Sequence, residues 1–219
     1  MLVSACSSKD PAARDPAAND TAPRALTGSQ AERLAIFRFN AYQQGMVAVQ
    51  GTVVGDQSVT INGWLDTAQG RGYALVRAPD AQHPGAFLTE WTAQQISAQD
   101  FTGSKPPVPP PDAGWQTTTL DPKASTLAAA QALLVSLSSD RPDNAQLLIQ
   151  NGARWLGSGT VDGQEADIMS GPVDPGSATQ QSSYRYWIDR DGNLLRVQAL
   201  LDGLHQSTFD FAAAPGVSF

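Results

Sequence analysis

The sequence of 219 residues has little of the chemistry that marks many enzyme and metal sites. It contains one cysteine, Cys6, and two histidines, His83 and His205. A single cysteine excludes an internal disulfide and a zinc site built from cysteines. The Gly-x-Ser-x-Gly, His-Glu-x-x-His and glycine-rich phosphate-loop motifs are also missing. We therefore predict no catalytic centre, no metal and no cofactor, and we expect a protein that is not an enzyme.

Positive charge and long apolar runs are also scarce. The chain has 14 Lys and Arg against 21 Asp and Glu, which gives a formal net charge of −7 at pH 7. Binding to nucleic acid needs clustered basic side chains, so this balance argues against a nucleic-acid partner. No stretch approaches the ~20 apolar residues that a membrane-spanning helix requires. With 41% hydrophobic residues, the sequence still predicts a globular domain with a substantial core.

The one cysteine stands in a motif that is typical of lipid attachment. Val3-Ser4-Ala5-Cys6 has the form of a bacterial lipobox, in which small residues precede a cysteine that becomes diacylated. The basic and apolar regions of a signal peptide are missing before it, so we expect the sequence to begin inside a longer one. Residues 1–26 then form a lipobox remnant and a disordered tether. Lipidation of Cys6 would anchor the protein to the extracytoplasmic side of the cell membrane. The alternative is an ordinary cysteine in a disordered tail.

The clearest structural signal is a hairpin near the C-terminus. Two runs of aromatic and branched apolar residues, 184–189 and 194–201, flank a turn at Asp191-Gly192. Asp-Gly is a favoured pair where both central turn residues need positive φ, so this pattern predicts a β-hairpin. A second turn at Asp202-Gly203 extends the hairpin to a three-stranded meander that includes residues 204–211.

The rest of the chain alternates between the same strand pattern and a helical one. A first helix can begin at a Thr27 or Ser29 cap, with Glu32 as the capping-box partner of Ser29. Period-two alternation then predicts four strands between residues 47 and 91. Further elements are expected as two helices, at 126–138 and 144–150, and as strands from residue 154 onward.

Residues 103–114, here called the proline-rich segment, interrupt this pattern. Lys105-Pro106-Pro107-Val108-Pro109-Pro110-Pro111 excludes a central strand and a helix interior. We interpret it as a stiff crossover, with a polyproline II ligand for a partner domain as the alternative. The order of elements predicts an α+β fold in which one large, curved antiparallel sheet packs against a few helices. Residues 27–219 would make up this single domain.

Aromatic side chains are the strongest candidates for a binding site. Trp64, Tyr73, Trp91, Tyr186 and Trp187 all fall in predicted strands. Such residues usually fill a core. Some of these strands carry large apolar side chains on both faces, so the sheet needs a cover on each side. Helices can supply one cover, and a bound lipid, the proline-rich segment or a partner can supply the other. The five aromatics are therefore candidate residues of an apolar groove, with the reservation that neighbouring positions point to opposite faces.

At this point the chain resembles the actinobacterial cell-envelope lipoproteins of the LppX/LprG kind, whose fold is similar to that of the LolA and LolB carriers. The resemblance is carried by the lipobox cysteine, the tether, the helix before a long meander, and Tyr186-Trp187-Ile188-Asp189 with its following Asp-Gly turn. It covers residues 28–219 and implies a half-barrel closed by helices around an apolar cavity. The proline-rich segment is a departure from that pattern.

Two functions follow as hypotheses. The first is an envelope-anchored lipoprotein that binds or carries a lipid or glycolipid in a half-barrel groove, where burial of apolar surface stabilises the complex. The second is a non-enzymatic surface lipoprotein that serves as an interaction module for another envelope protein. A continuous apolar cavity would distinguish the first from the second.

Overall fold

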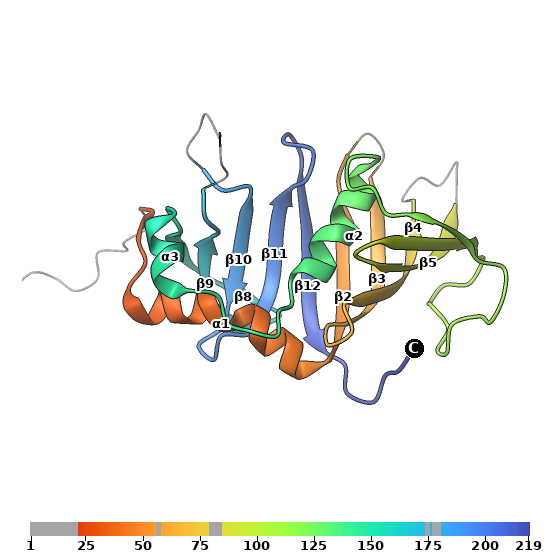
Figure 1. Ribbon diagram of the computed structural model, residues 1–219, viewed down its shortest axis with the longest axis horizontal. Helices are drawn as coiled ribbons and strands as arrows, with labels where there is room; N and C mark the ends of the chain where they lie inside the picture. The colour runs from red at the N-terminus through yellow and green to blue at the C-terminus, as the bar shows by residue number, and fades with distance from the viewer. Residues whose placement is uncertain (1–21, 56–57, 79–84, 174–175, 177–180) are drawn as a thin grey trace, which may run out of the picture.

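A computed structural model describes residues 22–55, 58–78, 85–173, 176 and 181–219 (Figure 1). Cys6 and His83 lie outside these residues. The described chain contains three helices, α1 (Gly28–Gln44), α2 (Thr126–Ser136) and α3 (Ala145–Gln150). It also contains twelve strands: β1 (Arg24–Ala25), β2 (Met46–Val53), β3 (Val59–Asp66), β4 (Arg71–Arg77), β5 (Ala86–Thr92), β6 (Gln95–Asp100), β7 (Gln116–Thr119), β8 (Arg154–Val161), β9 (Gln164–Ser170), β10 (Tyr184–Ile188), β11 (Leu194–Leu200) and β12 (Gln206–Ala213).

All twelve strands belong to one antiparallel sheet in the order β1-β8-β9-β10-β11-β12-β2-β3-β4-β5-β6-β7. The expected α+β class with a large antiparallel sheet and a few helices is confirmed. The predicted hairpin is present as β10 and β11, and β12 completes the meander. The sheet curves so strongly that β4 and β5 run across the direction of β10 to β2 in Figure 1.

The two halves of the sheet meet where β12 pairs with β2, although these strands are far apart in the sequence. Phe209 lies opposite Gly51 in this pair. A Cβ atom at Gly51 would lie 2.4 Å from the carbonyl oxygen of Thr208 and 2.6 Å from the Phe209 ring. Only glycine leaves room for the fully buried Phe209 at this junction.

The helices lie on one face of the sheet, which we call the helix face. The N-cap of α1 is Thr27, whose hydroxyl accepts from the backbone N–H of Gln30, while the Gln30 side chain accepts from the Thr27 N–H. This capping box replaces the expected pair of Ser29 and Glu32. In Figure 1, α1 and α3 lie over the β8–β11 half, and α2 crosses the β12–β3 region. No helix among the described residues has the length and apolar character to cross a membrane.

The main core lies between the helices and the helix face. It includes fully buried side chains from both halves of the sheet and from α2: Ile61, Trp91, Leu134, Met169, Ile188, Val197 and Phe209. Two smaller apolar clusters lie on the opposite face, one around Tyr73, Leu75 and Leu88, and one around Val161, Ala166, Trp187 and Leu195. Both faces of the sheet therefore carry buried apolar side chains, as the sequence indicated.

Two short strands surround the proline-rich segment and were not expected. The predicted four-stranded meander continues through β6 to β7, so that the segment connects two neighbouring strands. It lies against the opposite face of the sheet. The hydroxyl of Tyr73 donates to the carbonyl oxygen of Pro107 at 2.9 Å, and the Arg77 guanidinium donates to that of Gly103 at 2.8 Å. The segment thus supplies part of the second cover that the sheet needs.

Candidate functional site

The strongest candidate site is a cleft of about 370 Å³ between the three helices and β10, which we call the helix cleft. The periodicity of α1 places Leu34, Phe37 and Arg38 on the same side of the helix, because residues three and four apart share one face. The remaining walls come from α2, from α3, from the residues after β9 and from β10. Its lining is Leu34, Phe37, Arg38, Leu133, Ser136, Leu137, Asp143, Leu148, Gly171, Pro172, Tyr184 and Tyr186.

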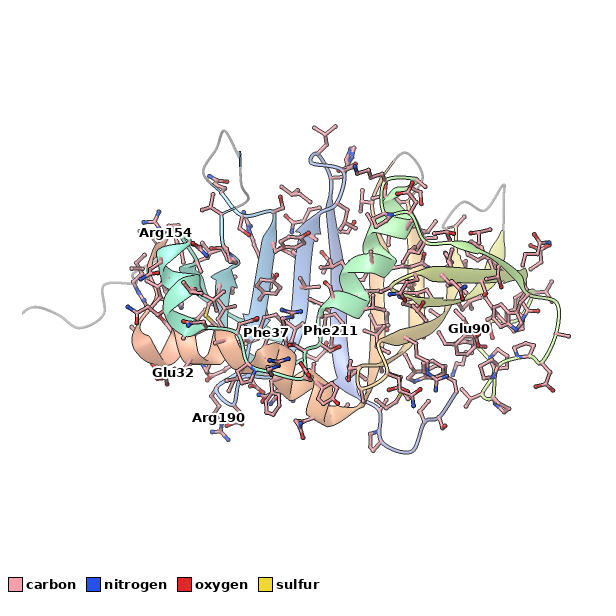
Figure 2. All side chains as sticks on the ribbon, in the orientation of Figure 1. Glu32, Phe37, Glu90, Arg154, Arg190 and Phe211 are labelled. Atoms are coloured by element: carbon pink, nitrogen blue, oxygen red, sulfur yellow. The ribbon has the colours of Figure 1, made fainter. Side chains whose placement is uncertain are left out.

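Aromatic rings form the floor of the helix cleft on the sheet side. The ring centroids of Phe37 and Tyr186 are 5.0 Å apart with a tilt of 36°, and Tyr184 stacks on Tyr186 at 6.3 Å. Both tyrosines are half-buried, whereas Phe37 is buried. A Cβ at Gly171 would lie 3.0 Å from the Ser182 hydroxyl and 3.3 Å from the ring of Tyr186, so glycine lets the chain after β9 pass close to this floor. Figure 2 shows Phe37 directed from α1 toward the interior of the molecule.

Arg38 ties the rim of the helix cleft together. Its guanidinium donates to the carbonyl oxygens of Ser136 and Ser138 at 3.0 and 3.4 Å, and to the Asp143 carboxylate at 3.2 Å. The backbone N–H of Asp143 donates to the carbonyl oxygen of Ala35 at 2.8 Å. The connection between α2 and α3 is thereby fixed to α1. Because the positive and negative charges at the rim face each other, they compensate within the protein.

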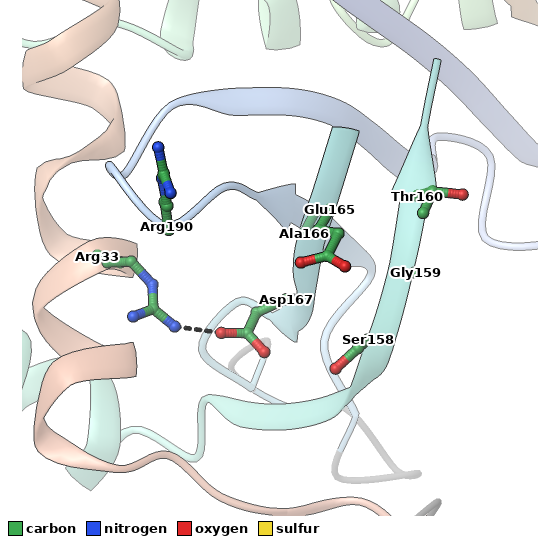
Figure 3. Close-up of a pocket in the computed structure, with 8 residues that line it drawn as sticks. All are labelled: Arg33, Ser158, Gly159, Thr160, Glu165, Ala166, Asp167 and Arg190. Carbon is green, nitrogen blue, oxygen red and sulfur yellow. Dashed lines mark hydrogen bonds and ion pairs between the residues drawn. The ribbon is translucent and has the colours of Figure 1, made fainter. Parts of the chain in front are cut away.

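A second and larger hollow, which four charged side chains help to line, lies between α1 and strands β8 and β9 (Figure 3). Its volume is about 540 Å³, and Arg33 reaches across it from α1 to the Asp167 carboxylate. Asp167 also accepts from the indole N–H of Trp155 at 2.7 Å and lies 3.5 Å from the Gln30 amide. These contacts dock α1 onto the sheet. Arg33 and Asp167 are thus occupied in holding the fold together.

The structure places the five sequence-predicted groove residues in four different surroundings. Tyr186 alone lines the helix cleft. Trp91 is buried below α2, where its indole N–H donates to the carbonyl oxygen of Gln131 at 3.0 Å. Trp64 and Tyr73 lie opposite each other in β3 and β4 on the other face, with ring centroids 6.1 Å apart. Trp187 lies on that same face, in the apolar cluster at the far end of the sheet.

The surroundings of Tyr73 leave little space beside its ring. Tyr73 is fully buried, and Phe219 and Trp115 approach it with centroid distances of 5.6 and 6.4 Å. Burial, followed by the negative charge of the facing Glu90, raises the pKa of Tyr73 to about 12. Burial also raises the pKa of Glu90, although Arg71 acts in the opposite direction. This part of the sheet is an internal core under the proline-rich segment.

Several cleft residues were missed as site residues because they belong to different elements. Leu34 and Phe37 fall in the first predicted helix, and Leu133, Leu137 and Leu148 fall in the two later ones, so each was predicted only as part of a helix. Periodicity shows which residues share one face of one element. It does not show which faces meet in space. The one usable signal was Tyr184, which alternates with Tyr186 and therefore shares its face.

Ionisable side chains beside the predicted Asp-Gly turns stabilise these turns. The Asp189 carboxylate accepts from the backbone N–H groups of Asp191 and Asn193 at 2.9 and 2.8 Å. His205 lies just before β12 and contacts the Asp202 carboxylate at 2.6 Å. Hydrogen bonds from His205 and Leu204 hold the pKa of Asp202 well below its usual range. Within the described part of the chain, no three His, Cys, Asp or Glu side chains gather in a way that could hold a metal ion.

Comparison with known proteins gives no family assignment. No family model matches the chain, and no curated protein matches it. Among solved structures, a DUF1329 family protein from Desulfovibrio piger aligns with 86% of this chain and 93% of its own, at 12% identity and a TM-score of 0.34. A structure described as an outer membrane lipoprotein-sorting protein domain, from Vibrio parahaemolyticus, aligns with 86% of this chain and 95% of its own, at 12% identity and a TM-score of 0.29. Both TM-scores are low, and neither likeness carries an inference about this protein.

Proposed function

We propose that this protein is an envelope lipoprotein that holds an apolar ligand in the helix cleft and catalyses no reaction. The cleft itself is the observation that supports the proposal. Its volume of about 370 Å³ falls within the roughly 300–1,000 Å³ of typical small-molecule sites, and most of its lining is aliphatic or aromatic. Transfer of alkyl groups from water into such a site is favourable by about 0.8 kcal/mol for each buried CH₂.

The lipid anchor is a separate part of this proposal. Cys6 would carry the acyl chains, and the following residues would let the folded body reach away from the membrane surface. Metabolic labelling with an alkynyl fatty acid tests this part, with Cys6→Ser as the control. A label that persists in Cys6→Ser, or that is never incorporated into a protein expressed with a signal peptide, would contradict it.

Ligand binding is tested on the full-length protein with a fluorescent fatty acid, after native mass spectrometry has been used to look for a co-purified lipid. Leu148→Trp should fill the helix cleft and weaken binding by at least tenfold, because Leu148 lines the cleft from α3. Leu147→Trp is the matched control, since Leu147 is the neighbouring residue of α3 and is 52% exposed. Equal binding by both variants would place the ligand elsewhere.

A protein-interaction role is the second candidate. It is favoured by α3, which exposes the side chains of both Leu147 and Ile149. Exposed apolar side chains can contribute to a contact surface for a partner. If purified protein carries no lipid and takes up no acyl probe, this interpretation is preferred. Its own test is whether Leu147→Ser combined with Ile149→Ser removes a cross-linked envelope partner in cells.

A further inference from the structure

We propose that two copies of this protein associate through β7, with the two β7 strands paired antiparallel about a two-fold axis at Thr118. The inference goes beyond the proposed function and does not depend on it, since it concerns an edge of the sheet and not the helix cleft. β7 is the last strand of the twelve-stranded sheet, and all four of its residues are exposed. It pairs with β6 on one side, and no described strand lies on its other side.

The pairing of β7 with β6 shows which backbone groups point away from the sheet. Just after β7, the N–H of Leu120 donates to the carbonyl oxygen of Gln94 at 2.9 Å. Opposed residues of antiparallel strands alternate between hydrogen-bonded and non-hydrogen-bonded pairs. Thr118 therefore bonds to β6, whereas Thr117 and Thr119 direct their N–H and C=O groups outward.

The side chains of β7 agree with this pattern. The hydroxyls of Thr117 and Ser97 are 2.8 Å apart across β7 and β6, and side chains lie closest in a non-hydrogen-bonded pair. Among the described residues, the outward N–H groups of Thr117 and Thr119 find no acceptor, and the Thr119 carbonyl oxygen is approached only by the hydroxyl of Thr118, at 3.5 Å. The outer edge of β7 is therefore available for a further strand.

The edge at the other end of the sheet is protected. Before β1, Pro23 has no N–H to offer, and within β1 the carbonyl oxygen of Ala25 accepts from the Arg24 guanidinium at 3.0 Å. β8 continues past β1, but a β-bulge distorts it there. Proline, charge and bulges are the usual devices that keep edge strands from pairing. β7 has none of them, because its register with β6 is regular and residues 113–120 include no proline and no charged residue.

A second copy fits this edge because β7 is complementary to itself. A two-fold axis at Thr118 places Thr117 opposite Thr119 of the second copy, so that every outward group of both strands finds a partner. An axis at Thr117 or Thr119 would set the other of these two threonines opposite a residue outside β7. Pairs of threonines across strands stabilise antiparallel sheets, whereas like charges opposite each other destabilise them. An uncharged edge therefore suits self-association in a chain with a net charge of −7.

The contact is short, so the dimer should be weak. Pairing of two four-residue strands falls at the low end of protein interfaces, below about 1,200 Å². The two-fold axis of such an edge-to-edge pair is perpendicular to the sheet. The helix faces of the two copies therefore lie on the same side of one continuous sheet.

Sedimentation equilibrium of the full-length, non-lipidated chain tests the association. A reducing agent prevents Cys6 from linking two copies through a disulfide. The average mass should rise from 23.1 kDa toward twice that value between about 10 μM and about 1 mM protein. A mass that stays at the monomer value over this range would overturn the proposal.

Thr117→Pro is the decisive variant, because it removes an outward N–H and leaves the backbone hydrogen bonds to β6 in place. The dissociation constant should rise by at least tenfold. Thr117→Val is the matched control, since it also loses the hydroxyl contact with Ser97 but keeps the outward N–H. Its dissociation constant should stay within about threefold of the wild-type value. Association of Thr117→Pro that equals that of the wild type would contradict pairing through β7.

Amide hydrogen exchange of the wild type, followed by NMR, gives a second readout that needs no variant to fold. Exchange at the amides of Thr117 and Thr119 should slow as the protein concentration rises. Exchange at Thr118 should change little, because this amide already bonds to β6 in the monomer. A mass that rises without slower exchange at Thr117 and Thr119 would place the contact on another surface and overturn the proposal.

Discussion

The two faces of the sheet are covered in different ways. On the helix face, three helices leave the helix cleft between them and β10. On the opposite face, the proline-rich segment, Trp115 and Phe219 pack directly on Tyr73, which is fully buried. A helix is a cylinder about 10 Å across, and it touches a curved sheet along a narrow strip. An irregular segment can follow the surface residue by residue. The comparison indicates that a cavity is a consequence of covering a curved sheet with helices.

The middle of the opposite face needs no cover at all. There, the Arg196 guanidinium in β11 forms a bidentate ion pair with the Asp210 carboxylate in β12. The neighbouring Asn62 and Thr60 of β3 are exposed. The two apolar clusters of this face are therefore separated by a solvated strip. On the helix face, in contrast, one continuous apolar core runs from β8 to β5.

Removal of Trp91 should have the largest effect, because this residue connects α2 to the sheet. Trp91→Ala deletes a buried indole and its hydrogen bond to Gln131, so we expect the free energy of unfolding to fall by about 3–5 kcal/mol in urea titrations. Trp64→Ala on the opposite face is the control and should cost about half as much, since Trp64 is only half-buried. Equal losses of unfolding free energy in the two variants would show that the cover on the helix face and the cover on the opposite face contribute equally to stability.

The hydrogen bonds of Arg38 at the rim of the helix cleft should contribute less to the free energy of unfolding than Trp91 does. Arg38→Met removes three hydrogen bonds between α1 and the α2–α3 connection, and we expect a loss of about 2 kcal/mol after allowance for solvent exposure. Hydrogen exchange should also become faster at the amides of Ser139 and Asp143, which donate to carbonyl oxygens of α1. Arg141→Met is the control, because the ion pair of Arg141 with Asp140 is largely exposed and should be worth almost nothing. Unchanged exchange in Arg38→Met would mean that the rim is held by apolar contacts alone.

On the opposite face, Tyr73→Phe probes how the proline-rich segment is attached. Loss of the hydrogen bond to Pro107 should cost about 1 kcal/mol. The raised pKa of about 12 means that the folded protein favours protonated Tyr73. Its contribution is therefore complete below pH 10 and is lost as the pH rises from 10 toward 12.

Between pH 10 and pH 12, the free energy of unfolding should fall less steeply in Tyr73→Phe than in the wild type. Tyr42→Phe serves as the control, because Tyr42 belongs to α1, and this helix lies away from the proline-rich segment in Figure 1. If the free energy of unfolding falls equally steeply with pH in the wild type and in Tyr73→Phe, the titrating group is not Tyr73.

The strands and helices were largely predictable, because each depends on a local pattern. The Asp-Gly turn and the apolar runs beside it defined β10 and β11, and helical spacing defined α1. The polar sequence Gln116-Thr117-Thr118-Thr119 has no apolar alternation, so β7 gave no signal. Its strand conformation depends on pairing with β6, for example through the Ser97 and Thr117 hydroxyls at 2.8 Å.

The candidate site was less predictable, because it depends on contacts between distant elements. Nothing local indicates that β12 pairs with β2, or that α1 and α3 meet over β10. The same limitation applies to the predicted groove aromatics. Trp64 and Trp91 are the same residue type, yet they lie on opposite faces of the sheet. Because the sequence indicated two apolar faces, it also indicated that the sheet has two covers. Which cover would leave a cavity could not be deduced from the sequence.

The smallest predicted effect concerns Glu90, which faces Tyr73 across β4 and β5 under the second cover. Burial raises the pKa of Glu90 above 4.5, so the folded state binds this proton more tightly than the unfolded state does. Stability is then complete below about pH 4.5 and falls as the pH rises through the higher folded pKa. Glu90→Gln imitates the protonated form and should raise the free energy of unfolding at pH 7 by about 0.5 kcal/mol or less, with no gain at pH 4.

Glu32→Gln is the matched control for this effect. Glu32 is exposed on α1, toward the end of the molecule opposite to Glu90 in Figure 2. Urea titrations of both variants at pH 4 and pH 7 provide the measurement. A gain in Glu90→Gln that appears at both pH values would come from packing, and a gain in both variants would come from the lower net negative charge. Only a gain confined to Glu90→Gln at neutral pH would show that the second cover excludes water closely enough to disfavour the charge of Glu90.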